Sequence, residues 1–271
     1  TYLKYLASGD KLGAFSLSEP QSGSDASNMK TLAKKVGDHY IVNGIKNWVT
    51  NGIHADYVLL FAITTPGVGH KGISCFIIEK GWDGFDIGKP ENKLGIRASD
   101  TCELYFDNVK VPKENLIGNM GEGFSIALAT LDGGRIGIAS QALGIAQASL
   151  NASISYSKNR VQFGKPISAN QAIQYKIADM AMEIESARLL TRKAAWMKDQ
   201  HENFGHCASM AKVYASEVAM RASTQCVQIH GGYGYMRESG IERLMRDAKI
   251  TQIYEGTSEI QRLVIARKLL Q

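Results

Sequence analysis

The stretch VPKENLIGNMGEG, residues 111–123, separates two parts of this 271-residue chain that differ in hydrophobic period. Proline and glycine accumulate in it, as they do in connections between structural units. Before it, apolar residues come in short runs typical of strands, and after it they recur at helical spacing. We therefore expect two domains, a β-rich domain over residues 1–115 and a helical domain over residues 116–271.

The β-rich part consists of short runs of β-branched and aromatic residues, with Gly, Asn, Asp and Pro between them. VGDHY (36–40) has the composition of a hairpin turn. Closely spaced strands without intervening helices favour a barrel or a sandwich. The expected strands are residues 13–18, 39–44, 46–50, 56–64, 72–79 and 102–111.

The helical part is clearest in QAIQYKIADMAMEIESARLL (171–190), where apolar residues recur at alternating steps of four and three. Such a stripe is wide enough to pack inside a helical bundle. The residues of the stripe are Ile173, Ile177, Met180, Ile184 and Ala187.

Segments 123–158, 204–230 and 258–270 have a similar helical pattern. The fold class predicted for the whole chain is multidomain α+β. A β-barrel-like domain is followed by a C-terminal bundle of the four-helix type.

Composition limits the classes of function. Hydrophobic residues make up 44% and charged residues 21%, as in a soluble globular protein. Apolar runs such as YVLLFAI (57–63) are too short to cross a bilayer, so no integral membrane segment is expected. The net charge of +5 is dispersed, which argues against a nucleic-acid partner and is compatible with a phosphorylated ligand.

The cysteines and histidines do not form a pattern of metal ligands. The four cysteines lie far apart without a CxxC pair, and the six histidines lack metal-ligand spacing. We expect no metal site, no disulfide framework and a reducing compartment.

One literal GxGxxG motif, GVGHKG (67–72), is interpreted as a hairpin loop. A dinucleotide site would need a helix N-terminus after the motif, and ISCFIIE has the pattern of another strand.

Three stretches contain polar, charged and aromatic residues that a plain loop or helix end does not require. They are LSEPQSGSD (17–25), QIHGGYGYMRE (228–238) and IYEGTSE (253–259). In the last, Ser258 and Gln261 have the spacing of a capping box. A capping box does not account for the carboxylate of Glu255.

In this order, the three stretches resemble the two signatures and the catalytic segment of the acyl-CoA dehydrogenase family. The resemblance runs from about Lys11 to the C-terminus. It corresponds to the family's middle β-domain and C-terminal bundle, and lacks the helical domain with which a family subunit begins. Gln21, Ser22 and Asn28 depart from the usual residues of the first signature.

Other segments indicate which members of the family the chain resembles most. RVQFGKPI (160–167) is similar to a further family segment, and LDGGRIGIASQALGIAQ (131–147) is most similar to short-chain, butyryl-CoA-type members. GKPENKLGIRASDTC (88–102) is similar to short/branched-chain members as well, so both substrate types stay open.

The resemblance implies FAD-dependent α,β-dehydrogenation of a short-chain acyl-CoA to the trans-2-enoyl-CoA, a step of fatty acid β-oxidation. Electrons would pass to an electron-transfer flavoprotein. It also implies a homotetramer built as a dimer of dimers, in the mitochondrial matrix or the bacterial cytoplasm. The alternatives are a 2-methylbutyryl-type dehydrogenase, an oxygen-using oxidase, and a non-catalytic fragment that binds flavin or acyl-CoA.

By the same resemblance, Glu255 is the catalytic base. Burial beside flavin and acyl chain would raise its pKa toward that of the acidified α-carbon. Some family members carry the base on the helix of LDGGRIG instead, but Gly134 occupies that position here. Gly256 would let the backbone turn tightly beside the ligand.

The family also implies contacts to FAD and to the substrate. The residues expected to contact FAD within one subunit are Phe15, Leu17, Ser18, Gly23, Ser24, Trp48, Val49, Thr50, Thr257 and Glu259. Those expected to contact FAD, chiefly of a neighbouring subunit, are Arg160, Phe163, Gln171, Gln228, Ile229, His230, Gly231 and Gly232. The expected substrate contacts are Ser24, Asp132, Gly133, Gly134, Arg135, Tyr254 and Gly256.

Overall fold

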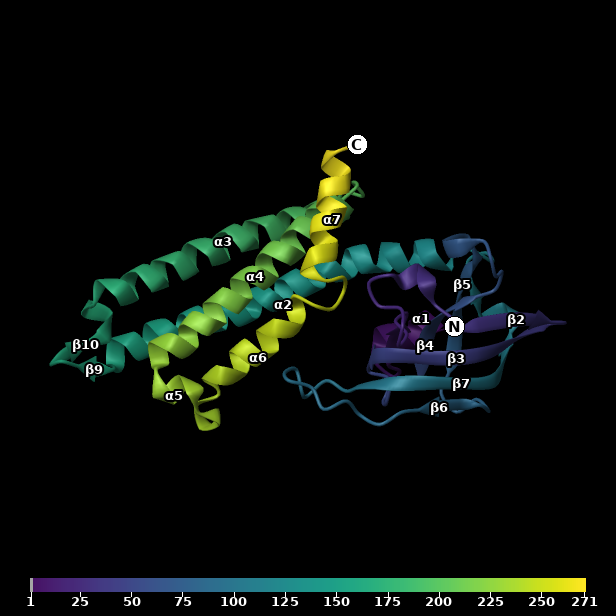
Figure 1. Cartoon of the computed structure of the whole chain (residues 1–271), viewed down its shortest axis with the longest axis horizontal. Helices are drawn as coiled ribbons and strands as arrows, with labels where there is room; N and C mark the ends of the chain where they lie inside the picture. The colour runs from purple at the N-terminus through teal and green to yellow at the C-terminus, as the bar shows by residue number, and fades with distance from the viewer. Residues whose placement is uncertain (1) are drawn as a thin grey trace. The chain divides into compact units, whose positions relative to one another are not determined.

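The computed structural model describes residues 2–271, which divide into two compact units. The first runs up to Lys93 and resumes over Arg97–Thr130, and the second consists of Leu94–Ile96 and Leu131–Gln271. Figure 1 labels most of the helices and strands of both. The predicted α+β class, a sheet domain followed by a helical domain, is confirmed.

The first unit contains a mixed eight-stranded sheet with the order β6-β7-β3-β2-β4-β5-β8, and β1 pairs with β4 in parallel. A short helix, α1 (Tyr2–Ser8), precedes the sheet. Among residues 2–271, β6 pairs only with β7 and β8 only with β5, so the pairing does not close a ring. The strands are β1 (Gly13–Ser16), β2 (Leu32–Val36), β3 (His39–Thr50), β4 (Tyr57–Ile63), β5 (Ile73–Glu79), β6 (Phe85–Ile87), β7 (Thr101–Pro112) and β8 (Leu116–Ile117).

Strand β3 joins two segments that were expected to be separate strands. Its register against β7 shifts between Val42 and Gly44 and again between Lys46 and Val49. A β-bulge bends a strand and re-aims its side chains. The second irregularity contains Trp48, which has a φ of 60°. Both hairpins expected in this unit are present, β2–β3 around Gly37 and β4–β5 around the GVGHKG segment.

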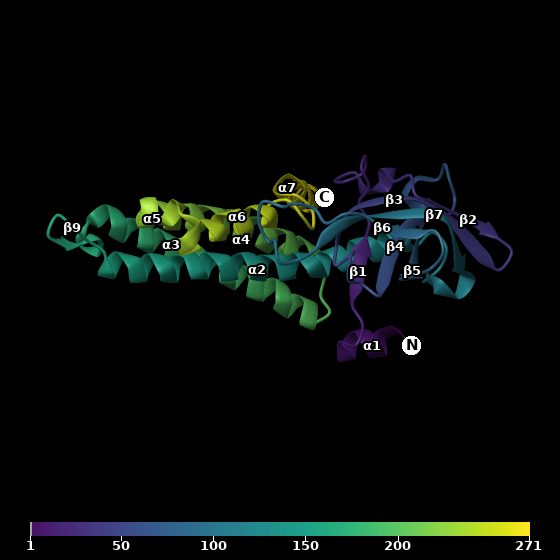
Figure 2. The ribbon, with the colours of Figure 1, turned by 90° about the horizontal axis from the view of Figure 1, so that it is seen from below.

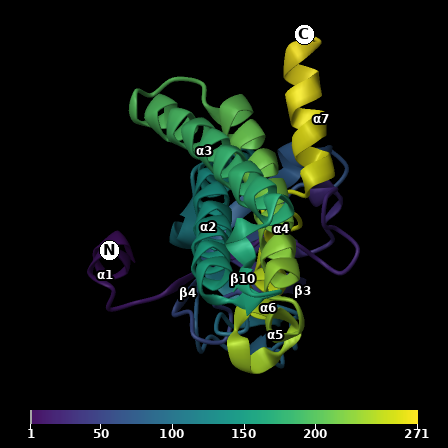
Figure 3. The ribbon, with the colours of Figure 1, turned by 90° about the vertical axis from the view of Figure 1, so that its left-hand side faces the viewer.

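The second unit is a helical bundle with alanine-rich contacts. Small side chains let helices approach closely, and Ala142 and Ala146 of α2 share one buried cluster with Ala211 and Ala215 of α4. Figure 2 shows α6 beside α4, and Figure 3 shows α2, α3 and α4 grouped together while α7 extends away from them. The helices are α2 (Gly123–Asn159), α3 (Gln171–Asp199), α4 (Gly205–His230), α5 (Gly232–Tyr235), α6 (Ile241–Thr251) and α7 (Ser258–Leu269).

The apolar stripe predicted on α3 is confirmed as part of this bundle core. Met180, Ile184 and Ala187 are buried, and Ile173 and Ile177 pack against the same cluster. None of the helices in the described part of the chain is long and apolar enough to cross a membrane.

The division between the units falls within α2, later than the predicted boundary at residues 115–116. Gly123 lies against β5, where a Cβ atom would come 2.4 Å from the carbonyl carbon of Ser74. Ala127 on the next turn is fully buried. The first turns of α2 therefore pack with the sheet unit, and the helix continues into the bundle unit.

Candidate active site

The loop between α6 and α7 has an unusual backbone conformation. Glu255 has a φ of 55° and Gly256 a φ of 86°. Glycine adopts such angles readily, whereas a non-glycine residue is strained there, and strain of this kind is concentrated at functional sites. The conformation of Glu255 is therefore itself a reason to look for chemistry at this loop.

The polar residues after Glu255 do not form the predicted capping box, and that prediction is wrong. Thr257 is the N-cap of α7, because its Oγ1 accepts a hydrogen bond from the Ile260 N–H at 3.3 Å. Ser258 is instead the first residue of the helix and is buried. The side-chain amide N–H groups of Gln261 donate hydrogen bonds to the carbonyl oxygens of Glu255 (3.1 Å) and Gly256 (3.0 Å) and so stabilise the strained turn.

The carboxylate of Glu255 lies over Gly134 of α2. A Cβ atom built at Gly134 would be 2.6 Å from Glu255 Oε2, closer than real Cβ contacts allow. The position that could have carried an alternative base is therefore empty of a side chain, and the Glu255 carboxylate occupies the space. The two candidate positions for a base converge on one place in the bundle unit.

Arg135, the next residue on α2, is buried beside this position with only 6% of its surface exposed. Its Nη1 donates to Asp132 Oδ1 at 2.5 Å and to Ser209 Oγ at 3.3 Å. Among residues 2–271, its Nε has no hydrogen-bond partner. This side chain was predicted to bind CoA, but its burial also makes it a source of positive charge for Glu255.

Lys212 of α4 is a site residue that the sequence reasoning missed. It is fully buried, and its Nζ donates to the Gly256 carbonyl oxygen at 2.7 Å. The signal was present, because Lys212 lies at helical spacing with Ala208, Ala215 and Ala219 on the core face of α4. A lysine within such an apolar stripe indicates a buried charge.

Burial and the neighbouring positive charges have opposite effects on the pKa of Glu255. Burial raises the pKa of the Glu255 carboxyl above its ordinary value, while the charges of Arg135 and Lys212 partly offset this rise. Burial lowers the pKa of Lys212 to about 8 and raises that of Tyr254 to about 12. A carboxylate whose pKa is raised in this way is suited to general-base catalysis.

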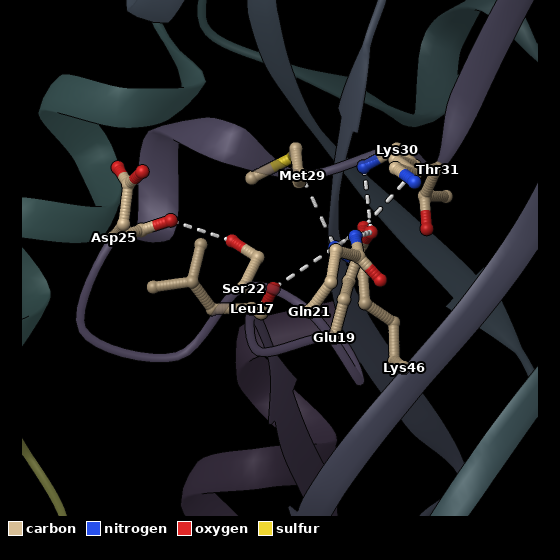
Figure 4. Close-up of polar contacts among 9 residues, drawn as sticks. All are labelled: Leu17, Glu19, Gln21, Ser22, Asp25, Met29, Lys30, Thr31 and Lys46. Carbon is tan, nitrogen blue, oxygen red and sulfur yellow. Dashed lines mark hydrogen bonds and ion pairs between the residues drawn. The ribbon is translucent and has the colours of Figure 1, made fainter.

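In the sheet unit, the LSEPQSGSD segment is built around an ion pair that sequence reasoning also missed (Figure 4). Lys46 Nζ of β3 donates to Glu19 Oε1 at 2.7 Å and to the Leu17 carbonyl at 2.9 Å, and both charged side chains are buried. Glu19 also accepts from the backbone N–H groups of Lys30 (2.6 Å) and Thr31 (3.1 Å). These contacts tie both ends of the loop after β1 to β3.

Burial and the partner's charge act in opposite directions on the pKa of each member of the pair. Burial acts to raise the pKa of Glu19, but the Lys46 charge and the donated hydrogen bonds outweigh it and leave that pKa below its ordinary value. Burial lowers the pKa of Lys46 to about 8, although Glu19 opposes this shift. A buried pair of this kind costs desolvation free energy and is strongly disrupted when one partner is removed.

The cofactor residues predicted in the sheet unit differ in how accessible they are. Trp48 is 62% exposed on the bulge of β3, and Thr50 and Ser24 are exposed as well. The side chains of Val49 and Leu17 are buried, so only their backbone could contact a ligand. The complete set predicted here, Phe15, Leu17, Ser18, Gly23, Ser24, Trp48, Val49 and Thr50, lies on β1, the loop after it and β3.

A second group of predicted residues lies at the end of the bundle unit away from α7 (Figure 1). Arg160 lies over the Tyr233 ring with its Cζ 5.5 Å from the ring centroid. Phe163 is fully exposed, with a φ of 52°, in the hairpin between β9 (Val161–Gln162) and β10 (Lys165–Pro166). Gln171 and Gln228 are exposed.

Two members of that group have side chains committed to the bundle interior. Ile229 is buried, and His230 stacks on Tyr156 with ring centroids 4.2 Å apart. The Nδ1 of His230 is also 2.8 Å from the Cys226 carbonyl oxygen. At these positions only the backbone could face a cofactor, as at Gly231 and Gly232 beyond the helix end.

Both units match known families. The family described as acyl-CoA dehydrogenase, middle domain, matches residues 14–109, and that described as acyl-CoA dehydrogenase, C-terminal domain, matches residues 121–270. The chain belongs to the acyl-CoA dehydrogenase family. Acyl-CoA dehydrogenases are FAD-dependent, and the resemblance predicted from the sequence is confirmed.

Related proteins are more than half identical to this chain over the aligned residues. A short-chain-specific acyl-CoA dehydrogenase of Clostridium acetobutylicum is 53% identical over 100% of this chain and 71% of the relative. The mitochondrial short-chain-specific acyl-CoA dehydrogenase of Rattus norvegicus is 54% identical over 97% of this chain and 64% of the relative.

Solved structures show the same fold. Butyryl-CoA dehydrogenase from Megasphaera elsdenii matches with a TM-score of 0.99 at 54% identity, over 100% of this chain and 71% of the matched chain. A chain from the structural work on the electron transferring flavoprotein of Acidaminococcus fermentans matches with a TM-score of 0.98 at 53% identity, with the same coverage.

The residues of the sheet unit fit a flavin. The exposed indole of Trp48 is an apolar plane on an irregular strand, where an aromatic ring system can stack. The nearby hydroxyls of Thr50 and Ser24 are exposed and available as hydrogen-bond partners. Large exposed aromatic side chains that the fold does not need for its core are typical of ligand sites.

Proposed function

We propose that this acyl-CoA dehydrogenase desaturates short-chain acyl-CoA thioesters to trans-2-enoyl-CoA, with Glu255 as the base. The observation that carries the proposal is the Glu255 carboxylate, held in a left-handed turn over Gly134 beside two buried cations. No other carboxylate in the described residues combines this burial, backbone strain and raised pKa.

The chemistry assigned to the chain's own residues is proton removal and polarisation. A Glu255 carboxylate oxygen takes the α-proton, and the raised pKa brings its basicity closer to that of the acidified carbon. The Glu255 N–H has no backbone acceptor within residues 2–271 and is available to bind the thioester oxygen. When bound, FAD supplies the acceptor for the hydride that leaves the β-carbon.

The proposed substrate contacts lie around the same carboxylate. Tyr254 and Gly256 flank Glu255, and Asp132, Gly133 and Gly134 lie on the facing turn of α2. Arg135 is assigned mainly to the charge balance of Glu255, because its guanidinium is engaged with Asp132 and Ser209. Contact with the CoA arm remains a secondary role for it.

The proposed FAD contacts within a subunit are Trp48 and Thr50 with the loop that carries Ser18, Gly23 and Ser24. Thr257 and Glu259, at the start of α7, are assigned to the ribityl or adenosine part. The exposed N–H groups of a helix N-terminus favour anionic and hydrogen-bond-accepting ligand groups.

The second group of residues supports an assembly in which subunits share FAD. Arg160, Phe163 and Gln228 belong to the β9–β10 hairpin region and the C-terminal end of α4. Figure 2 shows β9 and α5 at the end of the bundle unit opposite to α7, the helix that follows Glu255. A guanidinium and an exposed phenyl ring there would contact the cofactor of a neighbouring subunit.

A homotetramer is the assembly we propose. Tyr175, Met182, Leu189 and Trp196 recur every seven residues on α3, and all four are exposed although apolar. A sustained seven-residue repeat of this kind is typical of a helix that packs against a partner helix. This exposed α3 stripe differs from the buried stripe that fills the bundle core.

An electron-transfer flavoprotein is the proposed electron acceptor. The similarity to a chain from the work on the flavoprotein of Acidaminococcus fermentans supports this assignment. The proposed setting is fatty acid β-oxidation in a mitochondrial matrix or bacterial cytoplasm, as the mitochondrial relative from rat suggests for the first of these.

The proposal is tested by anaerobic titration of the full-length, flavin-loaded enzyme with butyryl-CoA, 2-methylbutyryl-CoA and octanoyl-CoA. We expect bleaching of the flavin absorbance at the lowest concentration with butyryl-CoA. Tighter reaction with 2-methylbutyryl-CoA would assign the enzyme to the branched-chain type. Failure of all three thioesters to bleach the flavin would contradict the proposed function.

A further inference from the structure

Lys212 is a buried cation that neither the packing of α4 nor the capping of α7 requires. Its side chain is fully buried between alanine-bearing turns of the helix, including those of Ala208 and Ala215. Burying an ammonium group costs several kcal/mol unless it is compensated, and a methionine would fill similar space without that cost. The charge must therefore contribute something that an apolar side chain would not.

The contact of Lys212 points to the strained turn. Its Nζ donates to the Gly256 carbonyl at 2.7 Å, and Gln261 Nε2 donates to the same oxygen at 3.0 Å. One charged and one neutral donor thus hold the peptide directly after Glu255. A turn with two consecutive positive φ angles persists only where surrounding contacts over-determine it.

We propose that Lys212 is a positioning residue for proton abstraction, holding the Glu255–Gly256 turn and supplying the positive charge that keeps the Glu255 carboxylate ionised. The inference rests on the proposed role of Glu255 as the base. It gives the two donors different roles. Gln261 stabilises the conformation of the turn, and Lys212 stabilises both this conformation and the negative charge of Glu255.

The charged groups around this pair come from three helices. Arg135 of α2, with its partner Asp132, faces Glu255, and Lys212 faces it from α4. Glu217 of α4 and Glu259 of α7 contribute more weakly to the potential at Lys212.

The expected effect of the Lys212 charge has a definite sign. Glu255 must be deprotonated to accept a proton, and burial disfavours that form. A nearby cation favours it, commonly by about one pKa unit or more. Loss of the cation should therefore move the acidic limb of the pH–rate profile toward higher pH.

The test follows α-proton exchange of acetyl-CoA in D₂O, because this thioester has no β-carbon and cannot be oxidised. Mass spectrometry of the recovered acetyl-CoA gives the exchange rate of the full-length, flavin-loaded enzyme across pH. Lys212→Gln keeps a donor and removes the charge, Lys212→Arg keeps the charge, and Gln261→Met removes the neutral donor.

For Lys212→Gln we expect the acidic limb to shift upward by about one pH unit, so that exchange below the limb falls about tenfold. Lys212→Arg should restore the wild-type limb. Gln261→Met should slow exchange at every pH without moving the limb. If Lys212→Gln does not fold, Lys212→Met supplies the same comparison of charge.

An unshifted limb in the uncharged Lys212 variant, with exchange slowed as in Gln261→Met, would overturn the charge role of Lys212. Wild-type exchange at every pH would overturn the positioning role as well. Glu255→Gln separates these results from a failure of the proposed function, because undiminished exchange in that variant would remove Glu255 as the base.

Discussion

At the scale of single residues, the site depends on the absence of a side chain at Gly134 and on the carboxylate of Glu255. Gly134 leaves the space that the Glu255 carboxylate fills, and Gly256 allows the turn that points it there. Arg135 and Lys212 then moderate the cost of keeping that carboxylate ionised. Each of these residues affects the reaction through the position or the charge of one side chain.

Gly134→Ala should lower the rate of flavin bleaching by substrate about 10²-fold, because its Cβ would displace the Glu255 carboxylate, and small misplacements of catalytic groups have effects of this size. Stopped-flow absorbance would measure it. Gly137→Ala, on the same helix with open space around it, is the control and should retain the wild-type rate. Equal rates in the two variants would contradict the placement of Glu255.

The sequence predicted roles for Glu255 and Gly134 but not for the two buried lysines, Lys46 and Lys212. Glu255 lies in a segment whose resemblance to a family carries its role with it. Lys46 looks like a solvated cation in a sequence, because strands expose most of their lysines. The place of Lys212 among alanines at helical spacing indicates burial but does not identify its partner. Only the structure shows that both are buried, at 0% exposure, and which oxygens they contact.

At the scale of elements, the long helices and central strands could be predicted because their periods persist over many residues. The stripe on α3 and the hairpin around Gly37 are examples. Strands β6 and β8 are too short to show a period. Helix α6 was not predicted, although Ile241, Leu244, Met245 and Ala248 recur in it at helical spacing. The cap of α7 was misplaced by one residue because Thr257 and Ser258 are both good capping residues.

The Glu19–Lys46 pair ties the loop after β1 to β3, and its removal should destabilise the sheet unit. Lys46→Met leaves Glu19 buried without a counter-charge and should lower the free energy of unfolding at pH 7 by about 3–5 kcal/mol. Denaturant unfolding followed by circular dichroism would measure the change. The double variant Lys46→Met with Glu19→Gln should recover part of it, because no uncompensated charge remains buried.

The same pair gives a pH dependence with a fixed sign. The pKa of Glu19 lies below its ordinary value in the folded chain, so its contribution to stability is present above pH 4.5 and is lost as pH falls through the folded pKa. Lys46→Met should raise the folded pKa of Glu19 and reduce this acid-dependent loss, so the difference in stability between the variant and the wild type should narrow as pH falls. Parallel acid profiles of the two proteins would show that the pair does not govern acid stability.

At the scale of the whole molecule, our proposal assigns the second group of predicted cofactor residues to the FAD of a neighbouring subunit. Leu189→Glu, within the exposed α3 stripe, should dissociate the proposed tetramer into smaller species and weaken FAD retention. Ligand binding and subunit association are linked when subunits share a site. Sedimentation velocity, read at protein and flavin wavelengths, would detect both changes.

Ala181→Glu is the matched control for that substitution, since it adds the same charge at an exposed position of α3 outside the stripe. It should leave the assembly intact. Dissociation by both variants alike would indicate a general effect of charge on α3, and a yellow monomer in the wild type would contradict the shared cofactor site.

The most direct measurement of the central claim is anaerobic stopped-flow mixing of the full-length Glu255→Gln enzyme with butyryl-CoA. The amide preserves the shape of the side chain but cannot accept the α-proton. We expect FAD to remain bound and its bleaching to slow about 10²–10⁴-fold or more, whereas Glu238→Gln, at an exposed carboxylate, should behave as the wild type. Bleaching of the Glu255→Gln enzyme at a rate near that of the wild type would contradict the assignment of Glu255 as the base.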